Sequence, residues 1–243
     1  MKKLYQEDLW NKILEEVKLF SNDKTMEYYF KSNILNINNL SDALSLLVSK
    51  NLKSQEIQEE NIAHDVDIAF TNKEIIDAVE EDINEIYHKD PACNYHFQPL
   101  LFYKGFQALQ AYRVANYWAE EKLGFSMYIQ SIVSEKFNVD IHPKAQIGKG
   151  IMIDHASGVV IGETARVGDY CSIFHGVTLG GVGAEKGKRH PQVGKNVLLS
   201  ANSTIVGNIK IGDNTKIGAG SVVLNDIPKD CTAVGVPAKI INN

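Results

Sequence analysis

The sequence predicts an α+β protein in which an all-helical domain precedes a parallel β-helix of hexapeptide repeats. Two observations support this prediction. Sixteen of the 18 glycines lie after residue 139, whereas nearly all aromatic residues lie before residue 138. In the second part, aliphatic residues recur every six positions. Because such a change in composition marks a domain boundary, we expect a helical domain over residues 1–138 and a β-helix domain over 139–243.

Spaced apolar residues predict helices in the first domain. In residues 41–52, apolar side chains recur three and four positions apart, and Ser41 is the expected N-cap. A second helix, over residues 71–87, begins with Thr71 and Glu74, which form a capping-box pattern. The apolar residues that follow lie on one face of this helix.

Proline and glycine predict where these helices end. Pro91 should end the second helix, because a residue that precedes proline disfavours helical geometry. A longer helical stretch over 100–137 is expected to break near Gly124, and its aromatic side chains are interpreted as core or subunit contacts. Acidic residues interrupt residues 1–17, which therefore read as an amphipathic helix rather than a signal peptide.

Composition excludes several classes of partner. The 243-residue chain is 44% hydrophobic and 23% charged, and its formal net charge of −5 argues against nucleic-acid binding. No apolar run approaches the ~18 residues that span a bilayer, so no membrane association is expected. The three cysteines lack metal-ligand spacing. They favour free thiols in a reducing cytosol, and hence a cytoplasmic protein.

The repeat of the second domain has a step of six residues. Helical and strand periods of 3.6 and 2 cannot sustain this step, whereas a chain that turns a corner every six residues can. Each aliphatic residue then points inward, and a following glycine or asparagine takes the tight turn. Three straight hexapeptide segments make one triangular coil, and the segments of stacked coils pair as parallel strands ~4.8 Å apart. The repeat positions are Ile141, Ile147, Ile153, Ile161, Val167, Ile173, Leu179, Val193, Leu199, Ile205, Ile211, Ile217 and Val223.

The repeat loses its phase twice. Eight residues separate Ile153 from Ile161, and fourteen separate Leu179 from Val193. The second interval is rich in glycine and basic residues, so we expect an extruded loop there. This loop excludes two residues from the coils if two hexapeptides are spanned, or eight if only one is spanned.

A histidine and a charged neighbour lie in each interruption. The first contains Asp154 and His155, and the second contains Arg189 and His190. Insertions that interrupt a solenoid commonly build its binding face, so we expect both pairs to be functional. The two interruptions lie about one coil apart, on the order of 5 Å along the axis. If they lie on different faces, a neighbouring subunit is required to bring them together.

These residue types suit a small zwitterion that carries a hydroxyl group. A neutral imidazole held by a carboxylate is a general base for an alcohol, and Asp140 is positioned to orient His155. The planar guanidinium of Arg189 could donate two parallel hydrogen bonds to a substrate carboxylate. Asp154 and Asp90 could accept hydrogen bonds from an ammonium group. The set is consistent with an amino acid such as serine.

Four segments resemble the serine O-acetyltransferase family of bacteria and plants. They are "DPACNYHFQPLLFYKGFQALQAYRVANYW", "VDIHPKAQIGKGIMIDHASGVVIGETARVGD", "VTLGGVGAEKGKRHPQVG" and "KIGAGSVVLNDIPKDCTAVGVPAKI". The resemblance covers about residues 60–240 closely and the earlier helical part more loosely. It implies a left-handed β-helix and an enzyme of cysteine biosynthesis. This enzyme would transfer an acetyl group from acetyl-CoA to the serine hydroxyl, giving O-acetylserine.

The resemblance also implies roles for individual residues. His155 would be the general base, steered by Asp140, and Glu163 is a further candidate next to the base. The residues that match those holding the serine ammonium and carboxylate are Asp90, Asp154, Arg189 and His190. Backbone N–H groups around Gly180 and Gly181 are candidates for contacting CoA or the developing oxyanion. Ala201 and Lys216 match positions that line the CoA cleft between adjacent β-helices.

The resemblance further implies assembly and regulation. Members of the family form trimers through the β-helix, often pair into hexamers through the helical domain, and are commonly inhibited by cysteine. Some members dock into O-acetylserine sulfhydrylase through an extended tail that ends in isoleucine. This sequence stops at "PAKIINN", with Asn243 last. We therefore expect no such complex.

Other classes remain open. A hexapeptide β-helix can host a zinc carbonic anhydrase with three histidine ligands, and this chain has seven histidines. The expected close pair of ligands on one long loop is missing, so no metal is expected. A non-enzymatic scaffold would tolerate loss of His155. A related acyltransferase could instead use the hydroxyl of homoserine or of a sugar.

Overall fold

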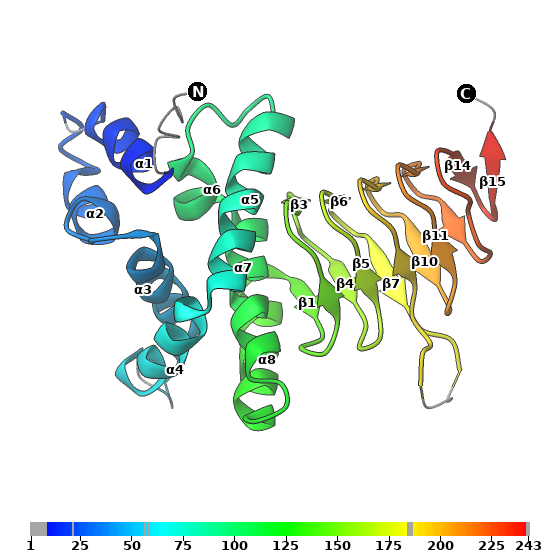
Figure 1. The fold of residues 1–243 in the computed structure, drawn as a ribbon, viewed down its shortest axis with the longest axis horizontal. Helices are drawn as coiled ribbons and strands as arrows, with labels where there is room; N and C mark the ends of the chain where they lie inside the picture. Colours follow the sequence, from blue (N-terminus) through cyan, green and yellow to red (C-terminus); the bar gives the residue numbers. More distant parts are fainter. Residues whose placement is uncertain (1–8, 21, 56, 58, 184–186, 242–243) are drawn as a thin grey trace, which may run out of the picture.

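Helices form the first part of the chain and a parallel β-helix forms the second (Figure 1). The computed structural model describes residues 9–20, 22–55, 57, 59–183 and 187–241. The last helix ends at Phe137 and the first strand begins at Val139. The solenoid runs away from the helices as a stack of coils, with its last strands at the far end (Figure 1).

The helices of the described residues are mostly short and pack into one core with the solenoid. They are α1 (Leu9–Lys18), α2 (Glu27–Phe30), the π-helix η1 (Lys31–Leu35), α3 (Leu40–Leu52), α4 (Glu59–Thr71), α5 (Lys73–Lys89), α6 (Phe97–Phe102), α7 (Lys104–Tyr117) and α8 (Leu123–Phe137). None of these described helices is long and apolar enough to cross a membrane. The amphipathic helix predicted over residues 1–17 is observed from Leu9 onward, and its first eight residues lie outside the described ones.

The cap predicted for α3 was wrong. Asn39, not Ser41, has the extended backbone of an N-cap, and its side-chain oxygen accepts a hydrogen bond from the backbone N–H of Asp42 at 2.9 Å. The hydroxyl of Ser41 instead donates to the carbonyl oxygen of Phe70 at 2.7 Å. Ser41 therefore joins α3 to α4 rather than beginning the helix.

The capping box predicted for α5 was also wrong. Asn72 is the N-cap, and its side-chain oxygen accepts hydrogen bonds from the backbone N–H groups of Glu74 and Ile75. Thr71 is the last residue of α4, and its hydroxyl donates to the carbonyl oxygen of Ile68. Thr71 is occupied within the preceding helix, so the next residue caps α5.

The predicted ends of the later helices agree better with the structure. Helix α5 ends at Lys89, just before the Asp-Pro pair that contains Pro91. The stretch predicted over 100–137 is interrupted at residues 118–122, just ahead of Gly124, which lies inside α8. A second interruption, at Tyr103, was not predicted.

The strands lie on three faces of the β-helix. Strands β1 (Val139–Ile141), β4 (Val159–Ile161), β7 (Thr178–Gly180), β10 (Thr204–Val206) and β13 (Val222–Val223) form the first face. The second face consists of β2 (Gln146–Ile147), β5 (Arg166–Val167), β8 (Gln192–Val193) and β11 (Lys210–Ile211). The third consists of β3 (Met152–Asp154), β6 (Ser172–Phe174), β9 (Leu198–Leu199), β12 (Lys216–Ile217), β14 (Thr232–Gly235) and β15 (Ala238–Ile241).

The register of the strands confirms the six-residue repeat. Repeat positions pair with one another from coil to coil, as in the parallel pairs Ile141–Ile161 and Ile161–Leu179 on the first face. Every repeat position is buried except Ile147, which is half-buried. The aliphatic residues therefore fill the interior of the coils, as the sequence predicted.

The two interruptions lie at different corners of the solenoid. The first joins β3 on the third face to β4 on the first face. It contains two consecutive residues in the left-handed region, His155 with φ 54° and Ala156 with φ 59°. The second joins β7 on the first face to β8 on the second, so one hexapeptide is spanned and eight residues are extra. Its residues 184–186 lie outside the described ones.

The helical part fixes the strand that leads into the first interruption. Asp82 of α5 is completely buried and accepts hydrogen bonds from Arg113 of α7 at 2.7 Å and from the backbone N–H of Ile151 at 2.8 Å. Gly105 of α7 lies so close to β3 that an added Cβ would overlap the carbonyl oxygen of Ile153. Both contacts hold β3 against the helices.

Candidate active site

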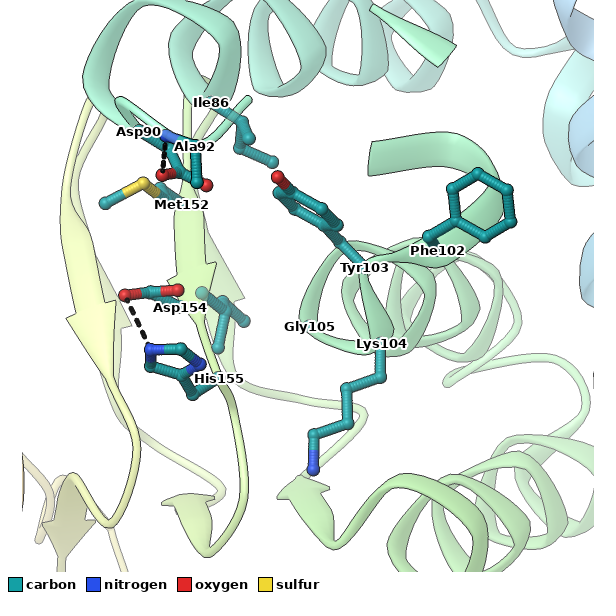
Figure 2. Close-up of a pocket in the computed structure, with 11 residues that line it drawn as sticks. Ile86, Asp90, Ala92, Phe102, Tyr103, Lys104, Gly105, Met152, Asp154 and His155 are labelled. Carbon is teal, nitrogen blue, oxygen red and sulfur yellow. Dashed lines mark hydrogen bonds and ion pairs between the residues drawn. The ribbon is translucent and has the colours of Figure 1, made fainter. Parts of the chain in front are cut away.

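His155 projects from the first interrupted corner. It directly follows β3, and its side chain is 75% exposed in this single chain. Its Nε2 lies 3.7 Å from Oδ2 of Asp154 (Figure 2). Left-handed geometry is costly for residues other than glycine and clusters at functional sites. Two such residues in succession, His155 and Ala156, are therefore a feature that the regular coil does not require.

A cavity of about 420 Å³ opens between this corner and the helices (Figure 2). This volume lies within the range typical of small-molecule sites, ~300–1,000 Å³. Met152, Asp154 and His155 lie on its solenoid side, facing residues from the segments around α6. The lining residues are Ile86, Asp90, Ala92, Phe102, Tyr103, Lys104, Gly105, Met152, Ile153, Asp154 and His155.

The helical side of this cavity contributes a carboxylate and a phenol. Asp90 directly follows α5 as its C-cap, and its Oδ1 accepts a hydrogen bond from the backbone N–H of Ala92 at 2.8 Å. Burial, together with the nearby Cys93 and Asp90, raises the pKa of Tyr103 well above its ordinary value. Tyr103 therefore stays protonated and can donate a hydrogen bond. It was missed from the sequence, where its only signal is the helix interruption that went unpredicted.

Lys104 supports the interrupted corner from the helices. Its ammonium group donates to the hydroxyl of Ser157, two residues beyond His155. Ser157 belongs to the same irregular turn, so this bond ties the turn to the start of α7. Lys104 was also missed, because nothing in its sequence context distinguishes it from an ordinary surface lysine.

A second cluster lies at the other interrupted corner. Arg189 donates to Oε2 of Glu163 at 2.6 Å, and this ion pair holds the pKa of Glu163 below its usual value. His190 is buried, and its Nδ1 accepts a hydrogen bond from the backbone N–H of Thr164 at 3.2 Å. Burial and the Arg189 charge lower the pKa of His190, which keeps its ring neutral. A neutral ring with Nδ1 as acceptor carries its proton on Nε2.

The charges of Glu163 and Arg189 act on His142, which therefore forms part of this second cluster. It was not predicted as an acetyltransferase site residue. Burial lowers the pKa of His142, while the charge of Glu163 opposes that shift. Among the described residues, this cluster therefore combines the guanidinium of Arg189 and the carboxylate of Glu163 with two imidazoles that favour the neutral state. A carboxylate ligand at Arg189 would have to share this cation with Glu163.

The structure does not bring the two clusters together within one chain. The cluster of Asp90, Asp154 and His155 lies at the corner between the third and first faces. Arg189 and His190 lie at the corner between the first and second faces.

The other predicted residues divide between these corners. Gly181 lies beside His190 and Arg189, and Gly180 ends β7 just before it. Ala201 lies at the same corner as His155, two coils further along, and Lys216 begins β12 with an exposed side chain. Asp140 lies on β1, where its Oδ1 accepts a hydrogen bond from Nε2 of Gln130 at 2.7 Å.

Metal coordination has no candidate cluster in the part of the chain that is described. Among these residues, no group of three or more His, Cys, Asp or Glu could hold a metal ion. Both corners combine imidazole groups with charged side chains.

A hexapeptide β-helix that carries an exposed histidine at an irregular corner is typical of the class of hexapeptide-repeat transferases. Residues 9–111 match the family model described as the N-terminal part of serine acetyltransferase, and residues 190–225 match that of the bacterial transferase hexapeptide. A serine acetyltransferase of Buchnera aphidicola is 43% identical over 238 residues, covering 96% of this chain and 87% of the relative. The chain therefore belongs to the serine acetyltransferase family.

Solved structures agree with this assignment. The crystal structure of the Neisseria gonorrhoeae serine acetyltransferase in complex with serine is 40% identical and superposes with a TM-score of 0.94, over 100% of both chains. A serine acetyltransferase in complex with cysteine is 42% identical and superposes with a TM-score of 0.94, over 97% of this chain and 99% of that one.

Proposed function

We propose that the protein transfers the acetyl group of acetyl-CoA to the hydroxyl of L-serine, with His155 as the general base. The products are O-acetyl-L-serine and CoA, which places the reaction in cysteine biosynthesis. The observation that carries this proposal is the projection of His155, beside Asp154, into a cavity at the one corner where two extra residues enter the coil. Family membership supports the choice of substrates.

The reaction needs one proton carrier. His155 takes the proton from the serine hydroxyl as that oxygen forms a bond to the thioester carbon, and the carbonyl electron pair moves onto the carbonyl oxygen. When this pair returns, the carbon–sulfur bond breaks, and His155 gives its proton to the departing thiolate. The carboxylate of Asp154, 3.7 Å from the ring, stabilises the imidazolium that exists between these steps.

The charged residues match the two ends of an amino acid. Asp90 and Asp154 line the cavity and would accept hydrogen bonds from the serine ammonium group. Arg189 and His190 would donate to the serine carboxylate, and Glu163 holds the guanidinium in place until it binds. Cysteine carries the same two ends, so it should compete for this site. The cysteine complex of a relative supports this.

We propose that two protomers complete each site. The carboxylate-binding corner of one chain would pack beside the His155 corner of its neighbour, because the two corners lie apart in a single chain. A trimer built through the β-helix domain (139–243) provides three such contacts, and the helical domain (1–138) supplies part of the serine pocket and pairs trimers into hexamers. The backbone at Gly180 and Gly181, with Ala201 and Lys216, would contact CoA between the protomers. Use of acetyl-CoA and free thiols favour the cytoplasm.

Asp140 is proposed to orient His155. Its support is its position on the first coil, which also carries His155, and the carboxylate would have to exchange its hydrogen bond with Gln130 for one with the imidazole. Asp140→Asn should therefore lower kcat less than loss of His155 does. Gln130→Leu, which frees the carboxylate, should leave kcat unchanged or raise it.

A thiol-release assay tests the function. Purified protein is supplied with acetyl-CoA and with serine, homoserine or a sugar, and the free CoA is measured. We expect turnover with serine, and a fall of ~10²–10⁴-fold in His155→Ala, the usual contribution of a general base. His64→Ala, at an exposed position of α4, is the matched control. Normal turnover of His155→Ala would reject the base assignment, and preference for homoserine or a sugar would reject the substrate.

A further inference from the structure

Tyr103 joins two helices at the edge of the cavity. It is both the C-cap of α6 and the N-cap of α7, with extended backbone angles (φ −94°, ψ 105°). Short polar side chains are preferred at an N-cap, because they accept a hydrogen bond from the first turn of the helix. The side chain of Tyr103 makes no such bond. The start of α7 therefore gives no reason for a tyrosine at this position.

The hydroxyl of Tyr103 points toward Asp90 within the cavity that both residues line (Figure 2). The phenol forms hydrogen bonds with the side chains of Asp90 and Cys93. The backbone that carries the ring is held on both sides. The N–H of Tyr103 donates to the carbonyl oxygen of Pro99 at 3.3 Å, and its carbonyl oxygen accepts from the N–H of Gln107 at 3.0 Å. The phenol is thus presented to Asp90 from a fixed base.

Asp90 is the stronger of the two acceptors. A phenol has one proton to donate, and hydrogen bonds to an ionised carboxylate are roughly twice as strong as those between neutral groups. The Sγ of Cys93 is a weak acceptor, and it donates to the carbonyl oxygen of Tyr95 at 3.5 Å. Burial raises the pKa of the Cys93 thiol, so this thiol is not a competing anion. The proton of Tyr103 therefore goes to the carboxylate.

Asp90 lies where a carboxylate attracts a cation. It directly follows the 17-residue helix α5, and the C-terminus of a helix carries a partial negative charge. The preceding residue, Lys89, forms its ion pair with Glu85 at 2.7 Å. Within the described part of the chain, the polar partners of the Asp90 carboxylate are the N–H of Ala92 and the phenol of Tyr103, and both are uncharged. A substrate ammonium group would supply the cation.

We propose that Tyr103 is a positioning residue, which holds the Asp90 carboxylate in the orientation that binds the ammonium group of serine. This inference rests on the proposed function. The N–H of Ala92 engages Oδ1 of Asp90 at 2.8 Å, and the phenol reaches the carboxylate from the side of α6 and α7. Without the phenol, the carboxylate has one donor fewer and must be ordered when serine binds, which lowers the affinity. Tyr103 takes no part in proton transfer at His155, so its loss should act on binding rather than on turnover.

Tyr103→Phe removes the hydroxyl and keeps the ring. The intact protein is assayed by thiol release for kcat and for the KM of both substrates, and thermal melting checks the fold. Tyr29→Phe is the matched control, because its hydroxyl donates to the carbonyl oxygen of Leu101 at 3.3 Å and Tyr29 does not line the cavity. In Tyr103→Phe we expect the KM for serine to rise ~3–10-fold, within the usual net contribution of one hydrogen bond. The kcat and the KM for acetyl-CoA should stay within about twofold of the wild type, and Tyr29→Phe should change none of the three.

Two fragments of serine show which end of the substrate is affected. Ethanolamine keeps the ammonium group and the hydroxyl but lacks the carboxylate, whereas 3-hydroxypropionate keeps the carboxylate and the hydroxyl but lacks the ammonium group. Each is titrated as a competitor of serine. In Tyr103→Phe, the inhibition constant of ethanolamine should rise by about the same factor as the KM for serine, and that of 3-hydroxypropionate should not change.

A double-mutant cycle tests whether Tyr103 acts through Asp90. When Asp90→Ala is already present, Tyr103→Phe should change the KM for serine by less than about twofold. A general loss of stability would act with or without Asp90, so the cycle decides even if Tyr103→Phe melts early. The inference is overturned if Tyr103→Phe leaves the KM for serine within about twofold of the wild type, raises it equally in both members of the cycle, or weakens both fragments alike. Wild-type protein that does not acetylate serine would overturn the proposed function instead, and the inference with it.

Discussion

The buried ion pair that joins the helices to the solenoid allows a prediction of stability. Asp82 is 0% exposed and accepts hydrogen bonds from Arg113 (2.7 and 3.2 Å), from Gln110 (3.1 Å) and from the backbone N–H of Ile151 (2.8 Å). Replacing Arg113 with methionine removes the cation but leaves the carboxylate in place. Breaking a buried pair on one side costs about 3–5 kcal/mol, because the remaining charge is uncompensated. At ~2–4 °C per kcal/mol for a protein of this size, the melting temperature should fall by about 6–20 °C.

The same substitution should make stability depend on pH. Burial raises the pKa of Asp82, although the Arg113 charge opposes the shift. Without Arg113, the folded protein holds its proton on Asp82 to higher pH than the unfolded chain does. The penalty is therefore absent below the unfolded pKa, ~3.9, and grows as the pH rises toward the folded pKa. Urea unfolding between pH 5 and pH 8 should show a larger loss at the higher pH.

Two further variants make this experiment decisive. Asp82→Asn combined with Arg113→Met keeps an oxygen for the N–H of Ile151 but removes both charges, so it should recover much of the loss. Lys18→Met breaks an exposed ion pair with Glu15 and should cost less than ~1 kcal/mol. A loss in Arg113→Met no larger than in Lys18→Met, or one that does not change with pH, would refute the reasoning.

The remaining predictions concern close packing and acid sensitivity. Gly105→Ala should lower the unfolding free energy by about 1–3 kcal/mol, because its Cβ would overlap the carbonyl oxygen of Ile153, whereas Gly124→Ala, with open space around it, should be neutral or stabilising in the same thermal melts. The pKa of His190 is lowered from its ordinary value of ~6.5, so its neutral form persists to pH values below ~6.5 and is lost only as the pH falls through the lowered pKa. Since protonation ends the hydrogen bond from Thr164, the KM for serine should rise as the pH falls through this lowered pKa. His190→Asn, whose amide oxygen accepts without titrating, should show a flatter profile.

The sequence could predict the solenoid because one residue in six must fill its interior. This requirement places an aliphatic residue at every sixth position, a period that neither a helix nor a plain strand has. In the structure, these aliphatic residues pair with one another from coil to coil. Helix starts were harder to predict. Ser41, Thr71 and their asparagine neighbours can all act as caps, and the choice depends on which side chain the adjoining helix already engages.

The candidate site could be predicted only where it disturbs the repeat. His155 and His190 were found because each lies beside a break in the six-residue step. The corner on which His190 lies could not be predicted, because it depends on whether the second loop spans one hexapeptide or two. Tyr103 and Lys104 lie outside the repeat and therefore give no such signal. Only the packing of the helices beside β3 brings them to the cavity.

The two-residue insertion at the first corner is what supplies the proposed base, His155, to an otherwise regular stack of coils. Deleting His155 and Ala156 would restore the spacing of six between Ile153 and Ile161, and Ser157 would then follow Asp154 as His175 follows Phe174. Such a deletion should give a first corner as regular as the others, in a protein that still folds and assembles but lacks the proposed base. In a scaffold of this kind, new chemistry can be gained or discarded by lengthening one bend, while the rest of the stack is left untouched.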